Sequence, residues 1–144
     1  LRASTSEEAK LSMVCWQGPE QNPWMTVPNR AAMTLVDLPS RSPDAPDPFS
    51  FADSRRVVDV LELAGWTNVD VRDFRTEVQI GGGVHSRLAA LHAYEFSPVK
   101  AVVDSDPDIG SDSVVDLMEV ALTPYQEDGI VKLPGAAWIF TADK

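Results

Sequence analysis

Three short apolar segments, separated by stretches with a helical pattern, constrain the fold of this chain more than any other feature. Residues 11–16 form a nearly continuous apolar run that begins at Leu11, which predicts a strand buried on both faces, as in a parallel sheet. Residues 69–80 alternate between apolar and polar side chains, as a half-buried antiparallel strand does, and residues 135–141 predict a closing strand. We therefore expect an α/β fold with these three strands in one sheet, the last two antiparallel.

Two of the intervening helices have recognisable ends. Asn22 is in position to cap a helix that has Pro23 as its first residue. Residues 50–65 give the clearest helical pattern, with Asp53 as the cap and Gly65 at the C-terminal turn.

The remaining segments predict helices and loops. Residues 85–103 have a helical pattern that Pro98 should break or bend, and residues 114–125 predict another helix. Residues 38–48 contain four prolines and predict a loop across the surface.

Composition excludes several classes of protein. The chain has 144 residues, which predicts a single domain over residues 1–144, and its 22 acidic and 12 basic residues give a net charge of -10, which disfavours nucleic acid as a partner. The longest apolar runs fall far short of the roughly 20 residues that a membrane span needs, so we expect no membrane partner. A single cysteine, Cys15, excludes an intrachain disulfide framework and predicts a reducing, cytoplasmic setting.

Several short motifs resemble those of a known enzyme family. They are VCWQ at 14–17, EQNPWM at 20–25, PFSFAD at 48–53, LAGW at 63–66 and LPGAAWI at 133–139. Together they resemble the C-terminal half of class I S-adenosylmethionine-dependent methyltransferases of the ubiquinone/menaquinone-biosynthesis-like group, and the similarity runs over most of the chain.

This resemblance implies a partial Rossmann-like methyltransferase sheet with covering helices. Residues 11–16 would be the family's fifth strand, residues 53–64 the helix before the sixth, residues 69–80 the sixth and residues 135–141 the seventh. The family builds its S-adenosylmethionine site from the first four strands, and fewer than a dozen residues precede the fifth strand here. We therefore expect no cofactor in this chain and no catalytic residue.

Trp16, Asn22 and Trp24 are the candidate substrate-binding residues. They follow the carboxyl end of a predicted parallel strand, which is the edge where open α/β sheets bind ligands. The resemblance implies that this region faces the substrate, and aromatic walls with one amide suit an apolar small molecule. The alternative interpretation is that both tryptophans cover the core.

For the other residues whose side chains could bind a ligand or react, the sequence favours structural roles. Gly81 to Gly83 lack the spacing of a dinucleotide fingerprint, and His85 and His92 are too far apart on a helix to form a metal site alone. The alternating aspartates lack the register of a calcium loop; they are Asp104, Asp106, Asp108 and Asp112. Cys15 lies within an apolar run, where cysteines usually behave as small hydrophobic residues.

The favoured hypothesis is a truncated or partial methyltransferase-like protein that lacks the methyl-donor site and is not catalytic alone. The alternative is a non-catalytic small-molecule-binding or assembly module, and a third possibility is that a separate polypeptide supplies the missing strands. Without those strands, residues 11–16 would form a sheet edge with little protection against pairing. We therefore expect a homo-oligomer that forms through this edge.

Overall fold

The computed structural model describes residues 9–39 and 46–144, so part of the predicted proline-rich loop, residues 40–45, lies outside the described residues. The helices are α1 (Pro23–Ala32), α2 (Ser54–Leu63), α3 (Ser86–Glu95), α4 (Pro98–Val103) and α5 (Ser111–Leu122). The strands are β1 (Lys10–Trp16), β2 (Thr67–Gln79), β3 (Gln126–Glu127) and β4 (Ile130–Asp143). The short 3-10 helices are η2 (Pro19–Gln21), η3 (Ile80–Gly82) and η4 (Thr123–Tyr125).

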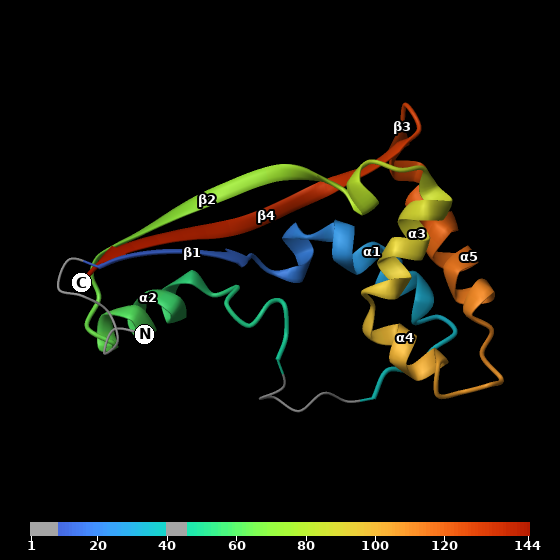
Figure 1. Ribbon diagram of the computed structural model, residues 1–144, viewed down its shortest axis with the longest axis horizontal. Helices are drawn as coiled ribbons and strands as arrows, with labels where there is room; N and C mark the ends of the chain where they lie inside the picture. The colour runs from blue at the N-terminus through green and yellow to red at the C-terminus, as the bar shows by residue number, and fades with distance from the viewer. Residues whose placement is uncertain (1–8, 40–45) are drawn as a thin grey trace. The chain divides into compact units, whose positions relative to one another are not determined.

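The strands form an antiparallel sheet in which β4 lies between β1 and β2 (Figure 1). β4 pairs with β1 from Lys10, opposite Asp143, to Trp16, opposite Ala137. The short strand β3 also pairs with β4. These strands confirm the mixed α/β class and the prediction that the three apolar segments share one sheet.

The β1 prediction was wrong in one respect. β1 pairs antiparallel with β4, and its side chains alternate between half-buried and exposed along most of the strand. Leu11 and Met13 pack toward α2, whereas Val14 on the opposite face is 65% exposed. The run appeared continuous because the residues on the exposed face include an apolar one, and periodicity cannot distinguish an apolar residue in a core from one at the surface.

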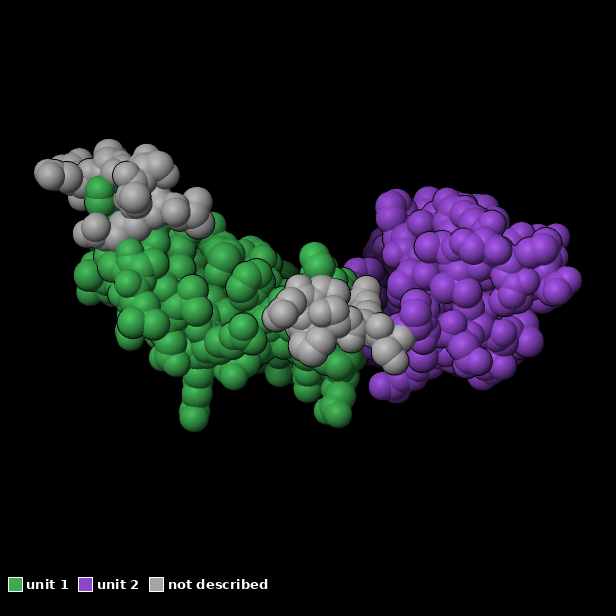
Figure 2. Space-filling view, turned by 90° about the horizontal axis from the view of Figure 1, so that it is seen from below, with its two compact units in different colours: residues 1–21, 46–76, 136–144 green, residues 22–45, 77–135 purple. Residues whose placement is uncertain are grey.

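Residue contacts divide the chain into two compact units (Figure 2). Unit 1 consists of residues 1–21, 46–76 and 136–144, and unit 2 of residues 22–45 and 77–135. β2 and β4 contribute residues to both units. Each unit has its own hydrophobic cluster, and the prediction of a single domain stays a prediction.

Unit 1 is built from α2 and the strands that it packs against (Figure 1). The predicted cap of α2 is confirmed, because the Asp53 carboxylate accepts hydrogen bonds from the backbone N–H groups of Arg55 and Arg56 at 3.0 and 3.3 Å. The indole N–H of Trp138 on β4 donates to the carbonyl of Ala52 at 2.8 Å and so holds the start of α2 near the sheet. The buried residues of this cluster are Val57, Leu61, Trp66, Phe140 and Ala142.

Unit 2 is mainly helical, and α5 packs against both α1 and α3. Met118 and Leu122 on the inner face of α5 are fully buried. Pro98 separates α3 from α4, as expected, and the Ser97 hydroxyl caps α4 by accepting from the backbone N–H of Val99 at 3.0 Å. None of the helices in residues 9–39 and 46–144 is long and apolar enough to cross a membrane.

Candidate functional site

Asn22 and Trp24 lie together in unit 2, at the start of α1. Asn22 occupies the N-cap position but forms no side-chain cap bond; its fully buried amide oxygen accepts a hydrogen bond from the Trp24 indole N–H at 3.1 Å. The Trp24 ring packs against the unit 2 core and close to the backbone of Gly135. The indole N–H and the amide oxygen therefore satisfy each other, and both side chains help to build the fold.

Trp16, the third predicted residue, belongs to unit 1. It is the half-buried last residue of β1 and stands opposite Ala137 of β4. Trp16 was selected because ligands bind at the carboxyl ends of neighbouring parallel strands. β1 pairs antiparallel with β4, so its neighbour does not present a carboxyl end beside Trp16. The structure thus pairs Asn22 with Trp24 and places Trp16 in the other unit.

A polar chain in unit 1 contains a residue that the sequence analysis did not select. The Gln17 side chain is 4% exposed and donates from Nε2 to Asp73 Oδ1 at 2.7 Å and to the Ala137 carbonyl at 3.2 Å. Arg75 Nε donates to the other carboxylate oxygen of Asp73 at 2.9 Å. Ala137 belongs to the central strand, so Gln17 reaches from the end of β1 across β4 to Asp73 on β2.

This polar chain has an electrostatic consequence. Hydrogen bonds from Arg75 and Gln17 lower the pKa of Asp73 below its usual value, because both donors favour the charged carboxylate. A buried amide bonded to a carboxylate fixes the backbone directly after β1. The available signal in the sequence was Gln17 itself, a polar residue that ends an apolar strand, but its partner is 56 residues away along the chain.

The substitution Asp73→Asn should lower stability at neutral pH, and the loss should shrink in acid. The pKa of Asp73 is lower in the folded chain than the roughly 3.9 of an unfolded chain, so its carboxylate contributes stability above that pH and loses it as the pH falls. Urea unfolding midpoints of wild type and variant at pH 7 and at about pH 3 measure the gap. Asp70→Asn, an exposed aspartate on the same strand, is the control. A gap that stays constant between the two pH values would contradict the prediction.

Side chains lie close to two of the three glycines in the triglycine segment. Gly81, Gly82 and Gly83 all have positive φ angles, which glycine adopts without steric cost. A Cβ at Gly81 would lie 2.6 Å from His92 Cδ2, and one at Gly83 would lie 2.9 Å from Gln79 Oε1. These contacts favour the structural interpretation, since an added Cβ would crowd His92 or Gln79 at two of the three glycines, whereas a Cβ at Gly82 would have nothing within 4 Å.

The acidic residues and Cys15 among the remaining candidates have surroundings that favour structural roles. Among the described residues, no group of three or more His, Cys, Asp or Glu side chains is arranged to hold a metal ion. Asp106 accepts a hydrogen bond from the backbone N–H of Asp108 at 3.0 Å, and Asp104 pairs with Lys100 at 3.0 Å. Partial burial raises the pKa of the Cys15 thiol, which disfavours the nucleophilic thiolate.

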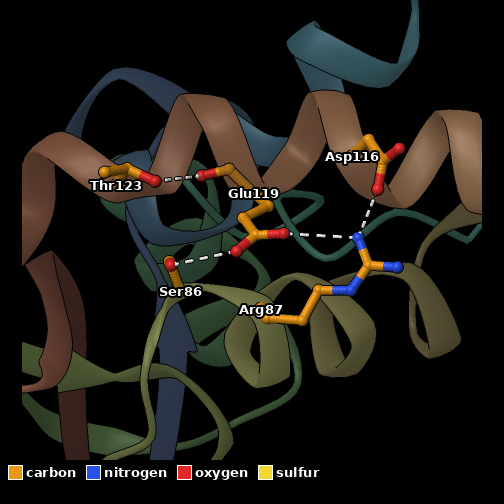
Figure 3. Close-up of polar contacts among 5 residues, drawn as sticks. All are labelled: Ser86, Arg87, Asp116, Glu119 and Thr123. Atoms are coloured by element: carbon orange, nitrogen blue, oxygen red, sulfur yellow. Dashed lines mark hydrogen bonds and ion pairs between the residues drawn. The ribbon is translucent and has the colours of Figure 1, made fainter.

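Helices α3 and α5 carry a cluster of polar side chains on the surface of unit 2 (Figure 3). Arg87 donates to Asp116 and also to Glu119, at 3.3 Å, and Ser86 Oγ lies 3.4 Å from the second oxygen of Glu119. The Thr123 hydroxyl donates to the Glu119 carbonyl at 2.8 Å. Each carboxylate already has a donor, so we assign this cluster to the joining of the two helices.

A scan of known protein-family models found no match to this chain, and a search of curated proteins found none either.

Proposed function

We propose that this chain is the substrate-side part of an S-adenosylmethionine-dependent methyltransferase-like fold and does not form the methyl-donor site by itself. On this proposal the chain alone does not transfer methyl groups, and its ligand is an apolar small molecule. A reducing, cytoplasmic setting is part of the proposal and is supported by the presence of only one cysteine, Cys15.

One observation carries the proposal: three of the five motifs that resemble the family, and residues 136–139 of a fourth, belong to unit 1. Cys15 of VCWQ stands opposite Trp138 of LPGAAWI in the sheet. The same tryptophan donates to Ala52 of PFSFAD, and Trp66 of LAGW packs in the same cluster as Phe140. Cys15, Trp66 and Trp138 of three motifs thus contribute to one hydrophobic cluster, and a hydrogen bond joins PFSFAD to it, which supports the proposal that these segments form one structural unit.

The order of the elements gives further support. β1 and β2 run in the same direction with β4 between them, and α2 precedes β2, which is a split β-α-β arrangement. One feature departs from the family order: α3, α4 and α5 all lie between β2 and β4. These three helices therefore do not lie between the fifth strand and the following helix, where the resemblance implies a substrate segment. The substrate-binding roles of Trp16, Asn22 and Trp24 remain part of the proposal.

The triglycine segment lacks the spacing of a cofactor-binding glycine fingerprint. This is the only glycine-rich stretch in the chain, and His92 and Gln79 pack beside two of its glycines. A cofactor cradle needs backbone N–H groups that a ligand can approach. We therefore derive no catalytic step from this chain alone; methyl transfer would require residues beyond these 144, either in the same polypeptide or in another.

Calorimetric titration with S-adenosylmethionine should give no saturable heat. A cooperative urea transition of the same sample is the control, because it shows that the protein was folded. One-to-one binding with a micromolar Kd would overturn the proposal. A parallel thermal-shift screen with hydrophobic small molecules addresses the substrate side: stabilisation by a ligand bound at Trp24 in unit 2 should disappear in Trp24→Phe and persist in Trp138→Phe, whose indole packs against the unit 1 core.

A further inference from the structure

The backbone groups of Ser12 and Val14 lie on the outer edge of β1, and this edge carries the inference. β1 is the terminal strand of the described sheet, with β4 on one side only. The backbone N–H of Gln17 donates to the Ala136 carbonyl at 3.0 Å, and the carbonyl of Ala9 accepts from the N–H of Lys144 at 3.0 Å. The direction of the backbone N–H and C=O groups alternates along a strand. The groups of the odd-numbered residues of β1 therefore point toward β4, and the groups of Ser12 and Val14 point away from it.

The side chains beside this edge are incompletely covered. Leu11, Met13 and Cys15 pack toward α2 but are only half-buried, whereas Phe140 and Ala142 on the neighbouring central strand are 0% and 4% exposed. Another strand beside β1 would cover the remaining apolar surface while pairing the outward backbone groups.

We propose that the occupant is a second copy of this chain, with the two β1 strands antiparallel about a two-fold axis at Met13. In this register Ser12 and Val14 of one copy exchange backbone hydrogen bonds with Val14 and Ser12 of the other. Met13 then stands opposite Met13, and Leu11 opposite Cys15, so apolar side chains face each other on the α2 side of the joined sheet.

Charge is compatible with the same register. Lys10 is the only charged residue of β1, and the two-fold axis places it opposite Trp16 of the second copy instead of opposite another lysine. Lys10 also keeps its own acidic neighbour, Asp143, at 3.6 Å within its copy. Like charges directly opposite each other destabilise strand pairs, and this register avoids them. Each copy carries a net charge of -10, so added salt should strengthen the association by screening the repulsion.

This inference stands independently of the proposed function, and light scattering of the full chain at micromolar concentration tests it. The expected mass is twice 15.7 kDa, and it should fall to 15.7 kDa in Ser12→Pro, because proline removes an outward N–H that β4 does not use. Ser12→Ala, which keeps that N–H, should remain dimeric. A wild-type mass of 15.7 kDa, or a Ser12→Pro variant that stays dimeric, would overturn the proposal.

A cross-linking variant tests the register and keeps the proposal falsifiable if Ser12→Pro does not fold. Leu11→Cys would face the native Cys15 of the second copy in a pair without hydrogen bonds, where Cα atoms about 4.5 Å apart allow a disulfide. Mild oxidation should give a dimer on a non-reducing gel. Ser12→Cys, one residue along the strand, should not cross-link. No cross-link in Leu11→Cys, or equal cross-linking in both variants, would count against this register.

Discussion

Replacing Gly135 with valine is expected to lower the free energy of unfolding by about 3 kcal/mol, through overpacking of a buried position. Gly135 is buried in β4, and an added Cβ would lie 2.5 Å from Val78 Cγ2 and 3.4 Å from Trp24 Cδ1. Val78 is β-branched and belongs to β2, so its side chain has few rotamers to which it can retreat. Trp24 is tied to Asn22 by its indole N–H, which limits relief on that side.

The measurement is urea unfolding monitored by tryptophan fluorescence. Gly135→Ala should show part of the loss, because the Cβ alone makes the short contact with Val78. Gly110→Ala is the matched control: its Cβ would lie 3.6 Å from Ser113 Oγ, an ordinary contact, and its φ is -73°. A Gly135→Ala midpoint that differs from wild type by no more than the Gly110→Ala midpoint would show that the β4 backbone moves away at little cost.

Features that depend on residues close in sequence were predicted well. Asp53 caps α2 because its carboxylate needs to reach only the next few backbone N–H groups. Pro98 separates α3 from α4 because proline has no backbone N–H to bond to the preceding turn of a helix. In both cases the cause lies within one helical turn, and a single sequence contains all of it.

Strand boundaries were predicted less well. β4 begins at Ile130, although the predicted strand began at Gly135. Pro134, just before the predicted start, is an exposed residue within the strand. Pairing with β3 starts before the proline, at Ile130 opposite Glu127, and extends the strand in that direction. A boundary set by a neighbouring strand cannot be read from local pattern alone.

The candidate site was the least accessible to sequence reasoning. The proximity of Asn22 and Trp24 followed from their spacing, but their hydrogen bond to each other uses the amide oxygen that had been assigned to a ligand. Gln17 was overlooked because its importance comes from Asp73 and Ala137, and the register that brings those strands together is a property of the whole sheet. Spacing indicates which residues are neighbours, whereas hydrogen-bond partners across a sheet depend on the tertiary fold.

Phe140→Ala should destabilise unit 1 by about 3–5 kcal/mol, the range for removing a buried aromatic ring. Phe140 is 0% exposed and belongs to a cluster with few other buried side chains, so little surrounding structure can collapse into the cavity. Phe74→Ala on β2, whose ring is 47% exposed, is the matched control and should cost far less. Urea unfolding of both variants measures the difference.

Amide hydrogen exchange shows where the structure is destabilised. In Phe140→Ala, protection should fall in β1, α2 and the C-terminal half of β4, all of which contribute to this cluster. Equal midpoints for the two variants would mean that the ring contributes no more inside the cluster than at the surface.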